Sequence, residues 1–261
     1  MRRLPTLLLL AGLLPPSQAL AQGVDAELWG AILASHTREV QDTAGVRVDY
    51  RGLAGSPEWK RLVDGLALAD PDALEGRSER LAFWIDAYNI LAIDLVVRHP
   101  GIESIRDIGS LLRPVWDREA GRVGGRARSL GEIEHEILRP MGDPRIHGAI
   151  VCASVSCPPL RREPFEAARL DPLLDDQMRR WLASPEKGLR VERDSNTVHL
   201  SRVFDWFAGD FEAEGGALAF ASRYAPEPER AWLAAHAEGL RIRYLPYDWD
   251  LNAQASSSPP P

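Results

Sequence analysis

The stretch that decides the fold is Leu81-Ala82-Phe83-Trp84-Ile85-Asp86-Ala87-Tyr88-Asn89, in the middle of a run from 78 to 98. Apolar residues recur at spacings of three and four along this run, and its other flank is apolar too. This pattern predicts a central helix that is buried nearly all round. Asp86 and Asn89 share one face of it. Because buried polar groups need partners, these two either bind a ligand or tie down neighbouring backbone.

The segments around this helix predict more helices and several short strands, read from periodicity and from capping and turn residues. Further helices are expected at 24–43, 56–69, 129–139, 172–183, 201–211 and 226–238. A short strand or extended arm is expected at 45–50, and single strands at 146–151 and 240–244. Hairpins are expected at 115–123, with the turn at Gly121, and from 189–191 to 198–200. The fold class is therefore α+β: a mostly helical single domain with a small, largely antiparallel sheet of short strands.

The two ends of the chain are expected to lie outside the globular domain, which spans 22–252. Residues 1–21 have two arginines, a short apolar run at 7–14 and the small-residue site Ala19-Leu20-Ala21, which together predict a signal peptide. An uncleaved membrane anchor is the alternative. We expect a periplasmic or secreted protein without membrane contact after cleavage. Residues 253–261 (AQASSSPPP) predict a disordered tail.

Composition limits the class of function. The chain has 261 residues, a formal charge of −7 and 45% hydrophobic residues. A chain of this length can bury a stable hydrophobic core without disulfides or metal ions. Its negative charge argues against nucleic acid as a partner. Two cysteines are too few for a four-thiolate zinc site or a disulfide scaffold. Composition names no reaction.

Reactive side chains gather between residues 132 and 157. This segment holds Glu134, His135, His147, Cys152 and Cys157. It contains both cysteines and two of the six histidines, so it is the candidate catalytic region. Arg145, within Asp143-Pro144-Arg145-Ile146-His147, joins Asp86 and Asn89 as a candidate binding residue.

Several motifs together resemble the bacterial, exported branch of domain-of-unknown-function family 547. They are the 81–89 run, the Ile-Glu-His-x-Ile-Leu-Arg helix, the Asp-Pro-Arg-Ile-His segment, the Ser-Cys-Pro-Pro-Leu loop, the 201–211 segment and the closing 247–252 segment. The likeness covers a core of about 45–252. Two departures stand out: the family usually has Asn where Asp86 stands, and commonly Asn-Cys-Gly where this chain has Val151-Cys152-Ala153. The family has no settled activity, so the resemblance implies none.

The first hypothesis for the reactive cluster is a thiol nucleophile. Cysteine attacks as a thiolate, so it needs a histidine or a helix N-terminus that lowers its pKa. If 146–151 is a strand, His147 and Cys152 face opposite sides about 16 Å apart and cannot pair. The remaining pairs are His147 with Cys157 and His135 with Cys152. On a helix, Glu134 points about 100° away from His135 and is better placed to orient His147.

Two other hypotheses stay open. The His135-Glu136 pair begins like a zinc-protease helix, but Arg139 replaces its second histidine; a metal site would need His135, His147 and a thiolate, and no ligand spacing indicates one. In an exported protein, Cys152 and Cys157 would readily form a disulfide in a non-catalytic binding or structural domain.

The leading hypothesis is an exported Cys/His-dependent hydrolase or transferase that acts on peptide or amide-like substrates. Its partner would be an unidentified small molecule or peptide. No cofactor and no metal are expected. The alternatives are the disulfide-bonded structural domain and the His/Cys metal-binding protein.

Overall fold

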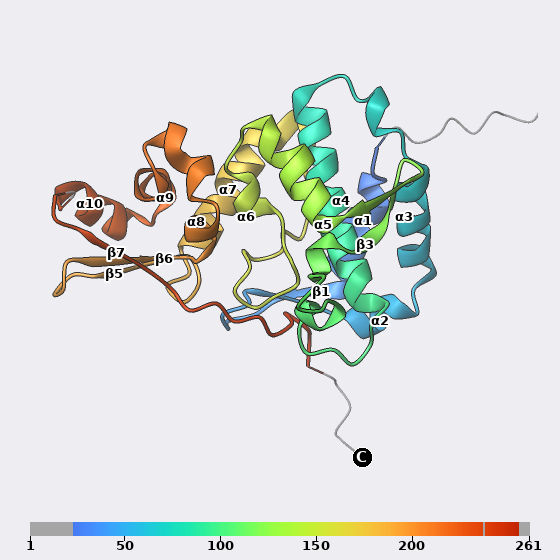
Figure 1. Ribbon diagram of the computed structural model, residues 1–261, viewed down its shortest axis with the longest axis horizontal. Helices are drawn as coiled ribbons and strands as arrows, with labels where there is room; N and C mark the ends of the chain where they lie inside the picture. The colour runs from blue at the N-terminus through green and yellow to red at the C-terminus, as the bar shows by residue number, and fades with distance from the viewer. Residues whose placement is uncertain (1–22, 237, 256–261) are drawn as a thin grey trace, which may run out of the picture.

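A computed structural model describes residues 23–236 and 238–255. The predicted signal peptide lies outside these residues. The body is elongated, with the N-terminal helices at one end and the last helices and strands at the other (Figure 1). The α-helices are α1 Ala26–His36, α2 Tyr50–Ala54, α3 Pro57–Leu68, α4 Arg77–Val97, α5 Leu130–Glu132, α6 Ile146–Ala149, α7 Leu170–Leu182, α8 Val203–Trp206, α9 Ala217–Tyr224 and α10 Glu227–Ala235.

Shorter helical turns connect these elements. Six are 3-10 helices and one is a π-helix within the described residues: η1 Pro71–Ala73, η2 Ile105–Ile108, η3 Val115–Asp117, the π-helix η4 Ile133–Leu138, η5 Arg139–Met141, η6 Ala167–Arg169 and η7 Ala208–Glu214. None of the described helices is long and apolar enough to cross a membrane.

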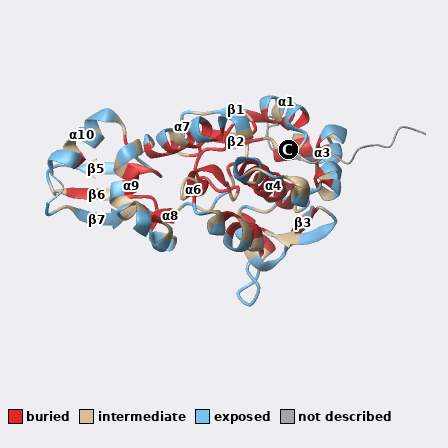
Figure 2. Ribbon diagram, turned by 90° about the horizontal axis from the view of Figure 1, so that it is seen from above, coloured by how far each residue is buried: buried red, intermediate tan, exposed pale blue. Residues whose placement is uncertain are grey.

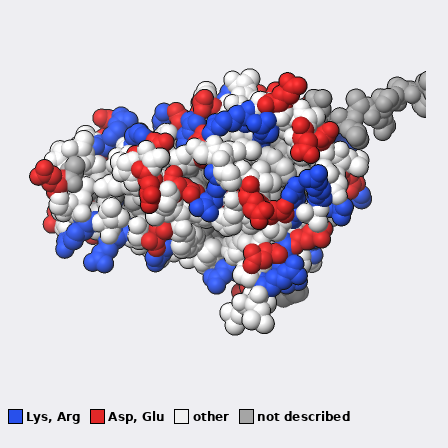
Figure 3. Space-filling model, turned by 45° about the horizontal axis from the view of Figure 1, so that its top comes forward, with Lys and Arg blue, Asp and Glu red and all other residues white. Residues whose placement is uncertain are grey.

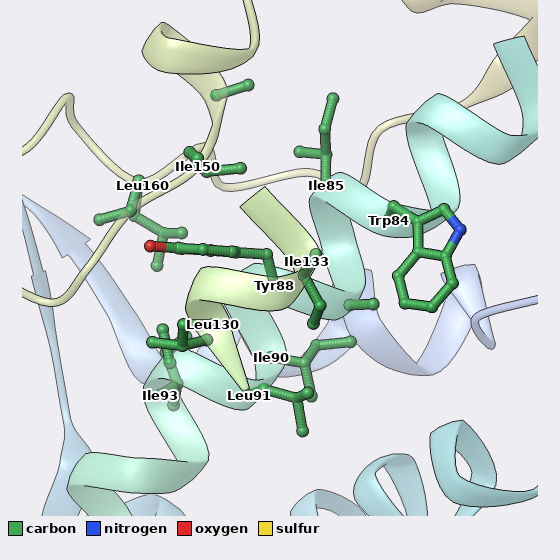
Figure 4. Packing of buried hydrophobic residues seen from close by; sticks show 14 of the residues in the cluster. Trp84, Ile85, Tyr88, Ile90, Leu91, Ile93, Leu130, Ile133, Ile150 and Leu160 are labelled. Carbon is green, nitrogen blue, oxygen red and sulfur yellow. The ribbon is translucent and has the colours of Figure 1, made fainter. Parts of the chain in front are cut away.

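Helix α4 is the centre of the larger hydrophobic core. Every residue from 81 to 96 is buried, as the sequence predicted. Its side chains pack against the α5–η4 segment and the chain around Ile150 and Leu160 (Figure 4). The ring of Tyr88 extends from α4 toward these last two residues. A second core joins α7 to α8, α9 and the C-terminal strands, and both cores show as red segments in Figure 2.

The strands form three small sheets rather than one. They are β1 Thr37–Glu39, β2 Val46–Val48, β3 Glu119–Val123, β4 Arg126–Ser129, β5 Leu189–Glu192, β6 Thr197–Leu200 and β7 Arg241–Tyr244. β1–β2, β3–β4 and β5–β6 are antiparallel, whereas β7 is parallel to β6. The mostly helical α+β class is confirmed.

Four predicted elements were wrong in detail. The hairpin predicted at 115–123 begins instead with the 3-10 turn η3, and its turn lies at Gly124-Gly125, between β3 and β4, rather than at Gly121. The helix predicted at 24–43 ends at His36, because β1 leaves to pair with β2. The strand predicted at 146–151 is instead helix α6, an error typical of a short apolar run, whose periodicity fits either state. The helix predicted at 201–211 divides into α8 and η7.

After β7 the chain runs back across the molecule as an extended strap, residues 245–255 (Figure 1). The strap forms isolated bridges with Val48 and with the segment after Cys152. Ala253 and Gln254 hydrogen-bond with the β2 segment, so the ordered chain continues beyond the predicted boundary at 252. The remainder of the predicted tail, 256–261, lies outside the described residues.

We predict that Tyr50→Phe destabilises the fold where the strap is anchored. The Tyr50 hydroxyl donates to Asn252 Oδ1 at 2.6 Å, and both residues are buried. Without this donor, a buried acceptor loses its partner, at a cost of about 1–2 kcal/mol in the free energy of unfolding. Urea unfolding measures the loss. Tyr244→Phe is the control, because the Tyr244 hydroxyl has no hydrogen bond within the described residues; equal midpoints for the two variants would contradict the prediction.

Candidate functional site

The predicted reactive segment contributes to a cavity of about 110 Å³ between the two cores. Both cysteines open into it, together with Glu134 and His147. The rest of its wall is mainly apolar and aromatic. These lining residues are Tyr88, Trp116, Ile150, Pro158, Val203, Trp206, Phe207, Tyr247 and Trp249.

The two cysteines are free thiols brought together by a tight turn. Their sulfur atoms are 2.7 Å apart, longer than the roughly 2.05 Å of a disulfide. The Cys152 N–H and Ser154 Oγ each donate to the Cys157 sulfur at 3.1 Å, and the Tyr247 hydroxyl lies 3.2 Å from it. The Cys157 sulfur is therefore surrounded by donors.

This arrangement separates the pKa values of the two thiols. Burial alone would raise the pKa of Cys157, but hydrogen bonds from Cys152, Ser154 and Tyr247 outweigh it and lower that pKa to about 6. The hydrogen bond with Cys157, followed by burial, raises the pKa of Cys152 well above its usual value. The pair therefore favours the thiolate at Cys157, with Cys152 as its protonated partner.

Buried His147 stands on α6 and is held by a carboxylate. Its Nε2 is 2.7 Å from Asp210 Oδ2, and its ring stacks on Phe207 at 4.2 Å. Arg139 binds both oxygens of Asp210 at 2.7 Å. Burial lowers the pKa of His147, although Asp210 opposes this. The hydrogen bond from His147 and those from Arg139 hold the pKa of Asp210 well below its usual value.

Glu134 reaches the cavity from the π-helix η4. The wider turn of a π-helix rotates side chains relative to an α-helix, and such segments often occur at functional sites. Glu134 Oε1 lies 3.9 Å from His147 Nδ1, close to the orienting position that the sequence predicted. Burial raises the pKa of Glu134 to about 7; Arg139 lowers it, while Cys157 and Asp210 raise it further.

The predicted Cys–His pairs are not formed. His135 does not line the cavity, and its Nδ1 faces Arg139 instead. Because α6 is a helix, the predicted separation of 16 Å for His147 and Cys152 does not apply, and both residues line the cavity. Among the described residues, however, no histidine nitrogen hydrogen-bonds to a sulfur. His147 faces carboxylates on both sides.

Two of the predicted binding residues hold the fold together instead. Asp86 accepts hydrogen bonds from Trp29 Nε1 and the Phe165 N–H. Asn89 donates to the Ala149 carbonyl and accepts from the Val151 N–H, so it fixes the backbone just before Cys152. These contacts match the alternative in which Asp86 and Asn89 tie down neighbouring backbone.

Arg145, the third predicted binding residue, lies away from the thiol cavity. Its guanidinium binds Asp143, Asp171 and Asp175. The ion pairs with Asp171 and Asp175 link the start of α6 to α7. It lines a separate, polar depression next to Arg223 and Tyr224.

Sequence reasoning missed several groups that complete the site. Asp210, Tyr247 and Ser154 are not among the candidate site residues that the sequence predicts. Lys187 lies beneath the cysteine turn, fully buried, and its Nζ donates to the Ala44 and Val155 carbonyls. No local pattern indicates Lys187, Asp210 or Tyr247, because each reaches the site from a distant part of the chain, whereas Ser154 lies within the cysteine turn itself.

The hypothesis of a metal site finds no support in this geometry. Across residues 23–236 and 238–255, no group of three or more His, Cys, Asp or Glu side chains is placed to hold a metal ion. His135, which that site required, points toward Arg139 rather than toward His147 or a thiol.

Comparison with known proteins returns one match. Residues 71–182 match the model of a family described as "Protein of unknown function, DUF547". The chain resembles this family. No curated protein and no solved structure matches it. The DUF547 match runs from η1 to the end of α7 and includes Glu134, His147 and both cysteines, whereas Asp210 and Tyr247 lie beyond it.

We predict that Asp86→Asn flattens the pH dependence of stability. Burial raises the pKa of Asp86 to about 8, against hydrogen bonds from Trp29 and Phe165 that lower it. In the unfolded chain, the Asp86 carboxyl group ionises near pH 4. The contribution of Asp86 to stability is therefore fully present below about pH 4 and is lost as the pH rises to about 8. Urea unfolding at several pH values measures this slope. The exposed Asp64→Asn should keep the wild-type slope, and an unchanged slope in Asp86→Asn would contradict the assignment.

Proposed function

We propose that this protein is a thiol-dependent hydrolase or transferase that acts on peptide or amide-like substrates, with Cys157 as the nucleophile. The observation that carries the proposal is the set of donors around the Cys157 sulfur, in a cavity shared with Glu134 and His147. A thiolate held by hydrogen bonds is the reactive form of cysteine. A periplasmic or secreted location, which rests on the signal peptide predicted at 1–21, is part of the proposal.

Glu134 supplies the proton transfers in this proposal. With a pKa of about 7, its carboxyl group both donates and accepts protons near neutral pH. The Cys157 thiolate adds to the substrate carbonyl carbon, and Glu134 protonates the leaving amine as the carbon–nitrogen bond breaks. Water, or an acceptor amine or hydroxyl in a transferase, then attacks the thioester and gives its proton to Glu134, which restores the thiolate.

The His147–Asp210 pair would act through Glu134 rather than on the sulfur. His147 Nδ1 faces the Glu134 carboxyl group, while Nε2 is fixed by Asp210. His147 is thereby a positioning residue for the acid–base group. This differs from the Cys–His dyad predicted from the sequence, but it keeps Cys157, His147 and Glu134 from the predicted set.

We predict that p-nitrophenyl acetate acylates Cys157. The expected result is a burst of p-nitrophenol and a mass increase of one acetyl group, both absent in Cys157→Ser. Glu134→Gln should keep the burst and slow the later turnover, because water then lacks its base. Lys60→Gln, an exposed substitution on α3 away from the cavity, is the control. A burst that survives in Cys157→Ser would overturn the proposal.

We also predict that iodoacetamide alkylates Cys157 with a midpoint near pH 6 in the reduced protein. Cys152→Ala removes one hydrogen-bond donor to the Cys157 sulfur, so the midpoint for Cys157 alkylation in this variant should move to higher pH. Peptide mass spectrometry assigns the alkylated residue. A midpoint for Cys157 at the ordinary value for a thiol, about 8.5, would show that the donors do not stabilise a thiolate.

The short distance between the sulfurs favours a second candidate, a structural domain closed by a Cys152–Cys157 disulfide. Sulfurs 2.7 Å apart need only a small movement to bond. Counting free thiols in the unreduced protein separates the two functions. Two free thiols, or acylation that returns on reduction, support the enzyme. No free thiols, together with no acylation after reduction, support the structural domain.

A further inference from the structure

The turn at 110–113 presents two leucines entirely to solvent. Leu111 is 103% exposed and Leu112 is 98% exposed, compared with 65% for Leu68, the next most exposed large hydrophobic residue described. Leaving a leucine in water forgoes the free energy that its burial would provide. Two adjacent leucines at the end of a loop therefore form an unusual surface.

This turn is held in shape by its own contacts. The Ser110 N–H donates to the Arg113 carbonyl at 2.9 Å, and the Arg113 N–H donates back to Ser110 Oγ at 3.1 Å. At its base the two arms touch, because a Cβ added to Gly109 would lie 2.6 Å from the Val115 nitrogen. The loop is thus a narrow projection, seen at the lower edge of Figure 2.

We propose that this turn inserts into a lipid bilayer, with Leu111 and Leu112 among the acyl chains and Arg113 at the level of the phosphates. This departs from the expectation, drawn from the sequence, of no membrane contact after signal cleavage. Between 108 and 116, Arg113 is the only charged residue. Figure 3 shows charged side chains spread over the body and an uncharged end on the projection. An apolar tip with one cation next to it matches the depth profile of a membrane interface.

The size and shape of the turn favour a bilayer over a protein partner. A stable protein interface buries about 1,000 Å² or more around a well-packed centre. Two side chains at the end of a convex loop offer far less. A lipid surface needs no complementary pocket, because the acyl chains adapt to whatever enters them.

The turn is joined to the rim of the thiol cavity. Arg106, on the helical turn that leads into it, stacks over Trp249 of the cavity wall at 5.1 Å, and Trp116 follows three residues after Arg113. Trp206, which stacks on Trp249, is partly exposed. Insertion of the turn would place the bilayer beside this aromatic rim, as is common for tryptophans at membrane interfaces.

Vesicle flotation tests the inference, using the chain from residue 22 so that the apolar run at 7–14 does not contribute. With vesicles of phosphatidylcholine and phosphatidylglycerol, the wild type should float. Leu111→Ser/Leu112→Ser should bind at least ~10-fold more weakly. Leu68→Ser, an exposed leucine elsewhere, should bind like the wild type. Arg113→Gln should lose its preference for phosphatidylglycerol over phosphatidylcholine alone.

Two results would overturn the inference: no flotation of the wild type, or equal flotation of the wild type and the double leucine variant. A self-association that the double variant abolishes, without vesicle binding, would assign the turn to a second copy of the chain and equally overturn it. The bilayer contact does not rest on the proposed function. Leu111→Ser/Leu112→Ser should still be acylated at Cys157 by soluble p-nitrophenyl acetate, so the two proposals fail separately.

Discussion

The site depends on the pairing between the cysteine turn and the C-terminal strap. The Val155 N–H donates to the Asp250 carbonyl at 2.8 Å, and the Asn252 N–H donates to the Ala153 carbonyl at 3.0 Å. A buried turn without regular structure would otherwise leave its backbone groups unpaired, at a high cost in free energy. The same pairing brings Tyr247 to both thiols. Residues about 90 positions apart thus build one cavity wall.

The strap also holds a strained residue in place. Ala153 has a φ of 63°, in the left-handed region that costs a side-chain-bearing residue of the order of 1 kcal/mol. This conformation reverses the chain so that Cys157 comes under Cys152. A glycine would adopt it freely, because it has no Cβ to crowd the following carbonyl. The chain keeps Ala153 because the hydrogen bond from Asn252 fixes its carbonyl.

The sequence was sufficient wherever local pattern decided the structure. The apolar periodicity around Tyr88 predicted α4, and Ser56 before a proline predicted the start of α3. The reactive segment was also found, because its residue types stand close together in the chain. The contacts among its cysteines, histidines and Glu134 were not predicted correctly. The position of His147 depended on one four-residue element, α6, which the sequence pattern predicted as a strand. Asp210 could not be placed from sequence, because only tertiary packing brings it to His147.

Charge balance around the cavity explains why the pKa of Glu134 lies near neutral pH. Cys157 and Glu134 are buried acids on the cavity wall and Asp210 is a partly exposed acid bound to His147, so their negative charges would repel one another. Arg139 and His147 bind Asp210 directly, so Asp210 keeps its charge and its pKa falls. Cys157 and Asp210 then both raise the pKa of Glu134, so that ionising the thiol favours the protonated carboxyl group. With a pKa of about 7, Glu134 therefore gains and loses its proton near neutral pH, which is the condition that acid–base catalysis beside a thiolate requires.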